Sequence, residues 1–203
     1  MTINLAVLAS GRGSNLQAIV RATEEGKLDA KVVLVLSDKA DAKALDFARE
    51  KGIAAVHVSL KDFAQKSDYE AELLRQIDQV DCQLICLAGY MRILSPYFIQ
   101  NAKVPVMNIH PALLPAFPGL HSQKQALDYG VKIAGCTVHF VDEGMDSGAI
   151  ILQKSVPVLD DDTEDTLSAR ILEQEHQAYW QAIQLFAENK LVVEGRTVKI
   201  KGE

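Results

Sequence analysis

Residues 4–20 read NLAVLASGRGSNLQAIV, a short apolar run, a glycine-containing turn and a helical pattern. Asn4–Ala9 is largely apolar without interruption, which is typical of a strand buried on both faces of a parallel sheet. The turn Ser10–Asn15 leads directly into the helical pattern of residues 16–20. The stretch therefore predicts a strand, a tight turn and a helix, which is how a βαβ unit begins.

The same alternation continues along the chain. Short apolar runs predict further strands, and patterns of about ten residues between them predict helices. The strands are expected at Lys31–Ser37, Ala54–Val58, Leu84–Ala88, Val106–His110, Ala134–Phe140 and Ile150–Val156, and the helices at 15–25, 42–51, 68–79 and 95–101. A long helix from Thr163 to Asn189 and a hairpin of Leu191–Val193 with Thr197–Ile200 end the chain. We expect an α/β fold with a mostly parallel, doubly wound, Rossmann-like sheet.

Composition favours an ordinary globular protein. The 203 residues are 48% hydrophobic and 24% charged, so we expect one domain over residues 1–203. A net charge of −6, from 21 basic and 27 acidic residues, argues against a broad nucleic-acid or anionic-membrane surface. The amino terminus does not resemble a signal peptide. Three cysteines in apolar segments indicate reduced core thiols in a cytoplasmic protein rather than a metal site.

The turn after the first strand is a candidate anion site. Free backbone N–H groups and the positive end of a helix at Gly13, Ser14 and Asn15 suit a phosphate, and Ser14 or Asn15 is able to cap the helix. Gly11 and Gly13 with Asp38 also resemble a dinucleotide fingerprint, although Leu16 occupies the third glycine position. A tight turn that binds nothing is the other alternative.

The strand Val106–His110 carries two polar residues on one face. Period-two alternation places Asn108 and His110 together at its carboxyl end, the edge where parallel sheets bind ligands. An amide stabilises an oxyanion and an imidazole carries a proton, which suits acyl transfer. The alternative for His110 is a hydrogen-bonded histidine with no catalytic role.

A glycine-punctuated acidic loop, residues 142–148, follows the strand Ala134–Phe140. We expect Asp146 in this loop to reach His110 and to hold the imidazole charged near neutral pH. An acidic turn cap is the alternative interpretation of Asp146.

The long helix has a carboxylate in its apolar stripe. At about 100° per residue from Leu167, Glu175 falls at about 80°, between Ala182 at about 60° and Phe186 at about 100°. A buried carboxylate needs donors. Either a nearby cation or water satisfies Glu175, or Glu175 accepts hydrogen bonds from a ligand at the edge of the sheet.

Taken together, the motifs SGRGSN, AGYMRIL, NIHPALLP, GLH and GCTVHFVDEGMDSG resemble the folate-dependent formyltransferases from about Leu5 to Phe186. The resemblance implies transfer of a formyl group from 10-formyltetrahydrofolate, a consumed cosubstrate, to the primary amine of glycinamide ribonucleotide (GAR) in de novo purine biosynthesis. With the loop context, it also suggests a cis Leu114–Pro115 peptide.

The resemblance implies a role for each matching residue. Asn108, His110 and Asp146 form the catalytic set, Gly13, Ser14 and Asn15 hold the substrate phosphate, and Glu175 holds the ribose. The implied folate contacts, largely through backbone groups, are Lys66, Met91, Arg92, Ile93, Leu94, Asn108, Asp142, Glu143, Gly144, Met145 and Asp146. Lys66 stands where relatives carry arginine, so its contact with a folate glutamate tail is that of a point charge.

Other functions share parts of these features. A formyltetrahydrofolate hydrolase has the same site chemistry but adds an amino-terminal regulatory domain, and a methionyl-tRNA formyltransferase adds a carboxyl-terminal domain and positive charge. A non-enzymatic dinucleotide-binding module accounts for Gly11, Gly13 and Asp38 but leaves the catalytic set unexplained. We expect a one-carbon transferase without metal, a monomer or homodimer acting on a small molecule in the cytoplasm.

Overall fold

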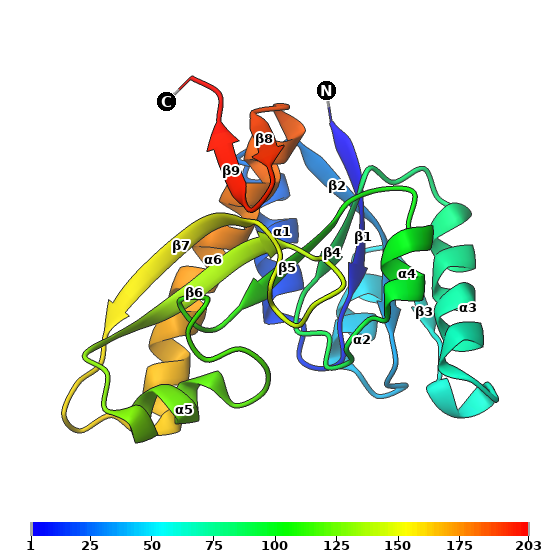
Figure 1. Ribbon diagram of the computed structural model, residues 1–203. Coiled ribbons are helices and arrows are strands. Elements are labelled where there is room, and N and C mark those ends of the chain that lie inside the picture. Colours follow the sequence, from blue (N-terminus) through cyan, green and yellow to red (C-terminus); the bar gives the residue numbers. More distant parts are fainter. Residues whose placement is uncertain (1, 203) are drawn as a thin grey trace. The chain divides into compact units, whose positions relative to one another are not determined.

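The structure, a computed structural model, describes residues 2–202 (Figure 1). The chain divides into two compact units, the first ending at Asn108 and the second beginning at Ile109. Each unit combines strands with helices, which confirms the predicted α/β class.

The first unit is a parallel sheet with the order β3-β2-β1-β4-β5. Its central strands are apolar and buried, as the uninterrupted hydrophobic runs predict. The strands are β1 (Ile3–Leu8), β2 (Ala30–Ser37), β3 (Ala54–His57), β4 (Leu84–Leu87) and β5 (Val106–His110), whose last two residues belong to the second unit. The helices are α1 (Ser14–Glu24), α2 (Lys43–Glu50), α3 (Lys66–Asp78), α4 (Pro96–Asn101) and the 3₁₀ helix η1 (Leu60–Asp62).

The strand order reverses at β1, which pairs with β2 on one side and with β4 on the other. In open α/β sheets, ligands bind outside the carboxyl ends of the strands at such a reversal. The turn Ser10–Asn15 follows β1, and residues 89–95 follow β4. The two segments meet there, since the Ser10 N–H donates to the Gly89 carbonyl oxygen at 3.0 Å.

The second unit contains an antiparallel pair, β6 (Ile133–Phe140) and β7 (Ile150–Pro157). The long helix α6 (Glu164–Ala187) packs on both strands and starts at a capping box of Thr163 and Thr166. The terminal hairpin, β8 (Leu191–Glu194) and β9 (Thr197–Ile200), joins β7 through β9. A short helix, α5 (Ser122–Tyr129), precedes β6.

The predicted strands and helices agree with the structure to within about two residues at each end, as is usual for element boundaries. The prediction missed α5, because this helix buries only Ser122 and Ala126 and so has no clear apolar stripe. The Leu114–Pro115 peptide is cis, as expected.

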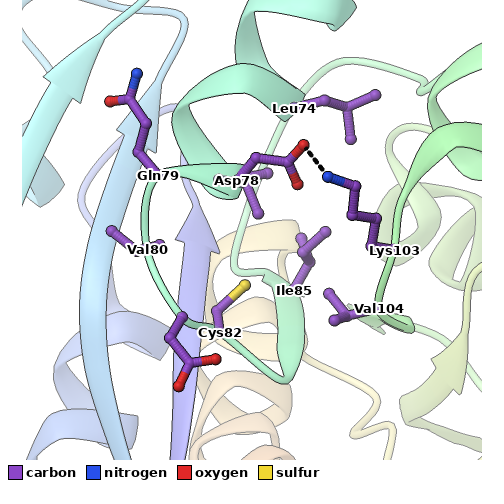
Figure 2. A pocket seen from close by; sticks show the side chains of 10 residues that line it. Leu74, Asp78, Gln79, Val80, Cys82, Ile85, Lys103 and Val104 are labelled. Atoms are coloured by element: carbon purple, nitrogen blue, oxygen red, sulfur yellow. Dashed lines mark hydrogen bonds and ion pairs between the residues drawn. The ribbon is translucent and has the colours of Figure 1, made fainter.

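Among residues 2–202, no helix has the length and apolar character needed to cross a membrane. A pocket of about 320 Å³ lies in the first unit beside the start of β4, and Figure 2 shows the Asp78–Lys103 ion pair at its wall. Cys82 also lines this pocket, and burial raises the pKa of its thiol. None of the residues predicted to carry function lines this pocket, so it is not the candidate site.

Candidate active site

The turn after β1 is shaped by Gly13. Its φ of 72° lies in the left-handed region, and a Cβ there would stand 2.8 Å from the Cβ of Ala44. Only glycine fits, because both the backbone angle and the close approach of α2 exclude a side chain. Gly13 is also the N-cap of α1, without a side-chain cap hydrogen bond, so the expectation that Ser14 or Asn15 caps the helix is wrong. Ser14 and Asn15 instead stand in the first turn, where helix N–H groups lack intrahelical acceptors.

Asp38, which follows β2, is committed to protein partners. Its carboxylate accepts from Ser10 Oγ at 2.6 Å and from Arg92 Nε at 2.7 Å, and its side chain is 2% exposed. A dinucleotide site needs this carboxylate for ribose hydroxyls. The contacts therefore argue against the dinucleotide-binding interpretation.

The segment after β4 contains four of the predicted folate contacts, Met91, Arg92, Ile93 and Leu94. The side chains of Met91 and Ile93 are each 62% exposed, while Leu94 is buried. Lys66, the first residue of α3, lies against this segment and donates from Nζ to the Ile93 carbonyl oxygen at 2.6 Å. The structure thus brings Lys66 together with the predicted folate segment.

His110 ends β5 and is 5% exposed, and Asn108, two residues earlier in the same strand, is half-buried. The His110 Nε2 donates to the Phe117 carbonyl oxygen at 2.9 Å, and Nδ1 lies 3.4 Å from Asp146 Oδ2. Both ring nitrogens therefore face oxygen atoms, Nε2 a backbone carbonyl and Nδ1 the Asp146 carboxylate. The predicted approach of Asp146 to His110 is observed.

Asp146 has a positive φ of 50° and a side chain that is 15% exposed. Aspartate tolerates this left-handed conformation better than most residues. The Gly119 N–H donates to Asp146 Oδ2 at 2.8 Å, so a backbone group orients the same oxygen that faces His110. The acidic loop that contains Asp146 is closed by Asp142, whose Oδ1 accepts from Gly144 N at 3.1 Å and from Ser147 Oγ at 2.6 Å.

The sequence interpretation assigned no role to His139, yet its Nε2 lies 3.8 Å from Asp146 Oδ1. Its Nδ1 donates to the Phe140 carbonyl oxygen at 2.8 Å, and burial lowers its pKa below the ordinary value of 6.5. A neutral His139 fits this geometry, since its one N–H goes to the carbonyl. The sequence feature that could have indicated His139 is its position near the end of β6, the strand that leads into the loop containing Asp146.

Glu175 lies in α6 and is 7% exposed, among the buried Ile171, Ala178 and Tyr179. Glu175 therefore lies in the apolar stripe of α6, as the helical periodicity predicts. Burial and the Glu175 carboxylate together raise the pKa of the Cys136 thiol in β6 to about 12. Cys136 is consequently a protonated core thiol, not a nucleophile.

In the part of the chain that the structure describes, no cluster of three or more histidine, cysteine or acidic side chains is arranged to hold a metal ion. His110 and Asp146 themselves carry an imidazole and a carboxylate, groups suited to acid–base and electrostatic chemistry. In general, an imidazole held beside an oriented carboxylate is able to transfer a proton and, when protonated, to stabilise developing negative charge.

Known proteins similar to this chain define its family. The formyl transferase family matches residues 3–183, so the chain belongs to this family. Phosphoribosylglycinamide formyltransferase of Escherichia coli (strain K12) is 42% identical over 201 residues, which are 99% of this chain and 95% of that protein. Glycinamide ribonucleotide transformylase 1 from Symbiobacterium toebii superposes with a TM-score of 0.96 at 48% identity, covering 98% of this chain and 94% of that one.

A longer relative also matches. The trifunctional purine biosynthetic protein adenosine-3 of Drosophila melanogaster is 49% identical over 191 residues, which are 93% of this chain. The matched region spans only 14% of the length of that relative.

Proposed function

We propose that this protein transfers the formyl group of 10-formyltetrahydrofolate to the primary amine of GAR, a step of de novo purine biosynthesis. The observation that carries the proposal is the His110–Asp146 pair, at 3.4 Å, within a member of the formyl transferase family. The names of full-length relatives supply the acceptor, because they are GAR formyltransferases.

The reaction follows from the chemistry of these groups. The GAR amine attacks the formyl carbon, and the carbonyl oxygen gains negative charge that the Asn108 amide and the His110 imidazolium stabilise. The C–N10 bond then breaks, the folate nitrogen takes up a proton, and the new amide nitrogen loses one. The products are formyl-GAR and tetrahydrofolate, so no oxidant or metal is required.

Two routes bring the proton to N10. His110 delivers it directly, or Asp146 shuttles it through water. Because His110 Nε2 already donates to the Phe117 carbonyl and Nδ1 faces Asp146, direct delivery requires the ring to leave one partner. The route through Asp146 and water leaves the ring in place, and we favour it for this reason.

The remaining assignments complete the proposed site. The turn of Gly13, Ser14 and Asn15 binds the GAR phosphate through helix N–H groups, and Glu175 accepts from the ribose hydroxyls. The folate pterin lies against Met91–Leu94 and residues 142–146, with Asn108 at the formyl group and Lys66 toward the glutamate tail. We propose one formyltransferase domain over residues 1–203, active in the cytoplasm as a monomer or homodimer, without metal, nucleic acid or membrane partner.

A spectroscopic assay of tetrahydrofolate formation, run with GAR and without it, tests this function. Turnover that requires GAR supports the proposal, whereas equal turnover without GAR identifies a hydrolase. A parallel titration with NADH tests the dinucleotide-binding alternative, for which we expect no binding.

A further inference from the structure

Two buried carboxylates of the first unit direct their hydrogen bonds at one short segment. The side chains of Asp38 and Glu70 are 2% and 0% exposed. Burying a carboxylate removes its hydration and is unfavourable unless its oxygens are paired and hydrogen-bonded. Both carboxylates contact residues 91–95, either directly or through Ser10 and Lys66. We call residues 91–95 the donor segment.

Asp38 holds the start of the donor segment. Its carboxylate accepts from Arg92 Nε at 2.7 Å and from Ser10 Oγ at 2.6 Å. Ser10 Oγ in turn accepts the Met91 backbone N–H at 2.9 Å. One carboxylate therefore fixes the side chain of residue 92 directly and the backbone of residue 91 through a hydroxyl group.

Glu70 holds the end of the donor segment. It accepts the Ser95 backbone N–H at 2.8 Å and also the Ser95 hydroxyl. Its Oε1 lies 3.6 Å from Lys66 Nζ, which donates to the Ile93 carbonyl oxygen at 2.6 Å. Ser95 is the N-cap of α4 but makes no side-chain cap bond, so its hydroxyl serves Glu70 where a capping serine ordinarily serves its own helix.

We infer that Asp38 and Glu70 are positioning residues that hold the donor segment in the shape that binds the formyl donor. The inference rests on the proposed function, which assigns this segment to folate. Leu94 is the buried apolar side chain of the segment, while Met91 and Ile93 are each 62% exposed, so apolar packing holds only part of it in place. The two carboxylates anchor four of its five residues, Met91, Arg92, Ile93 and Ser95.

A charged anchor suits this task. Well-packed apolar residues often stabilise a fold as much as a buried ion pair does, so buried charges are better explained where one particular conformation matters. A binding segment fixed in advance does not lose conformational entropy when the ligand arrives, and its affinity rises accordingly. Asp38 and Glu70 thus act on donor affinity, without contact with the reacting atoms.

The test uses Asp38→Asn and Glu70→Gln, which keep side-chain shape but turn an amide N–H₂ toward a donor. We expect KM for 10-formyltetrahydrofolate to rise about tenfold in each variant, since a charge-assisted hydrogen bond is lost. We expect kcat and KM for GAR to stay within about threefold of wild type, because the reacting groups are untouched. Matched controls are Asp78→Asn and Glu24→Gln, carboxylates of ion pairs with Lys103 and Lys51 at the surface, which should leave both KM values unchanged.

Amide hydrogen exchange provides a readout independent of folate. Asp38→Asn should speed exchange at Met91, and Glu70→Gln should speed it at Ser95, with the strands of the sheet unaffected. Faster exchange throughout the first unit, with unchanged KM for the donor, would mean that the carboxylates only stabilise the fold and would overturn the inference. Faster exchange confined to the donor segment, with unchanged KM for the donor, would instead remove folate from this segment and contradict the proposed site.

Ser10→Ala and Ser95→Ala keep the test decisive if a carboxylate variant does not fold. Each removes one hydroxyl link and leaves the carboxylate in place. Ser10→Ala should loosen the Met91 amide and raise KM for the donor by a smaller factor than Asp38→Asn, because the Arg92 contact remains. An unchanged Met91 exchange rate in Ser10→Ala would contradict the proposed link.

Discussion

The segments that follow β4 and β5 are both irregular, yet they are held in different ways. Residues 91–95 are anchored by the buried carboxylates Asp38 and Glu70. Residues 111–115 are anchored by neutral groups, since Thr137 Oγ1 donates to the Ala112 carbonyl at 2.7 Å and accepts the Leu114 N–H at 3.0 Å. A carboxylate anchor is weakened when a substitution neutralises its charge. A neutral hydroxyl anchor is weakened only when the hydroxyl group itself is removed.

The Thr137 hydroxyl, the neutral anchor, has all of its hydrogen-bonding capacity satisfied. Gln153 Nε2 also donates to Thr137 Oγ1 at 3.0 Å and to the Leu114 carbonyl at 2.9 Å. A hydroxyl has one hydrogen and two acceptor lone pairs, and Thr137 uses all three. On the proposed function, the charged anchors set the affinity for the formyl donor, and the neutral anchor fixes the chain that follows His110, the proposed catalytic residue.

The largest expected effect lies at His110 and Asp146, the proposed catalytic pair. We expect His110→Ala and Asp146→Ala each to lower kcat by about 10²–10⁴-fold, with little change in KM for GAR, because their interactions strengthen as charge develops. Steady-state kinetics on the folded proteins measures this effect. The double variant should be little worse than either single one, since the two groups act as a unit. Full activity in either single variant would contradict the assignment, and Asn108→Ala provides the same test for the oxyanion.

Thr137→Val tests the neutral anchor at nearly constant shape. It leaves the Leu114 N–H, the Ala112 carbonyl and part of Gln153 without a buried partner, each at a cost of about 1–3 kcal/mol. We expect the free energy of unfolding in urea to fall by about 3 kcal/mol, while KM for the donor stays near that of wild type. Thr197→Val, at an exposed position of β9, is the matched control and should change stability by less than about 0.5 kcal/mol. If Thr137→Val instead raised KM for the formyl donor while leaving KM for GAR unchanged, the two anchors would not differ in function as we expect.

Glu175→Gln asks whether a third buried carboxylate serves a ligand as well. On the proposed function it weakens GAR binding by about 1.5–3 kcal/mol through lost charge-assisted bonds to the ribose, and leaves folate affinity nearly unchanged. Calorimetric titration with each ligand separates the two effects. If the variant is instead destabilised while its folded fraction binds GAR normally, Glu175 is a structural carboxylate and the ribose assignment fails.

The sequence predicted the parts of this molecule that depend on local patterns. Strand periodicity placed Asn108 and His110 together, and helical periodicity placed Glu175 in an apolar stripe. It did not reveal that Glu70 is fully buried, because its partner Ser95 is 25 residues away and neither residue stands out in its own segment. Long-range polar pairing is decided by tertiary packing, so the two carboxylate anchors and the His139–Asp146 approach became visible only in the structure.

The smallest expected effect is a pH dependence at His139. Burial lowers the pKa of His139, so between the ordinary value of 6.5 and its lower folded value the unfolded chain binds a proton that the folded chain does not. Stability contributed by the neutral ring is therefore complete above pH 6.5 and is lost as the pH falls, with a slope of at most about 1.4 kcal/mol per pH unit. Because His139 is buried in β6, acid should weaken the second unit through this group. The anchors of the first unit contain no histidine in the described contacts. Urea unfolding followed by the single tryptophan, Trp180, from about pH 7.5 to pH 5 measures the loss in wild type and in His139→Gln. We expect the variant to lose less stability over this range, and parallel curves for the two proteins would show that His139 is protonated equally in the folded and unfolded chains.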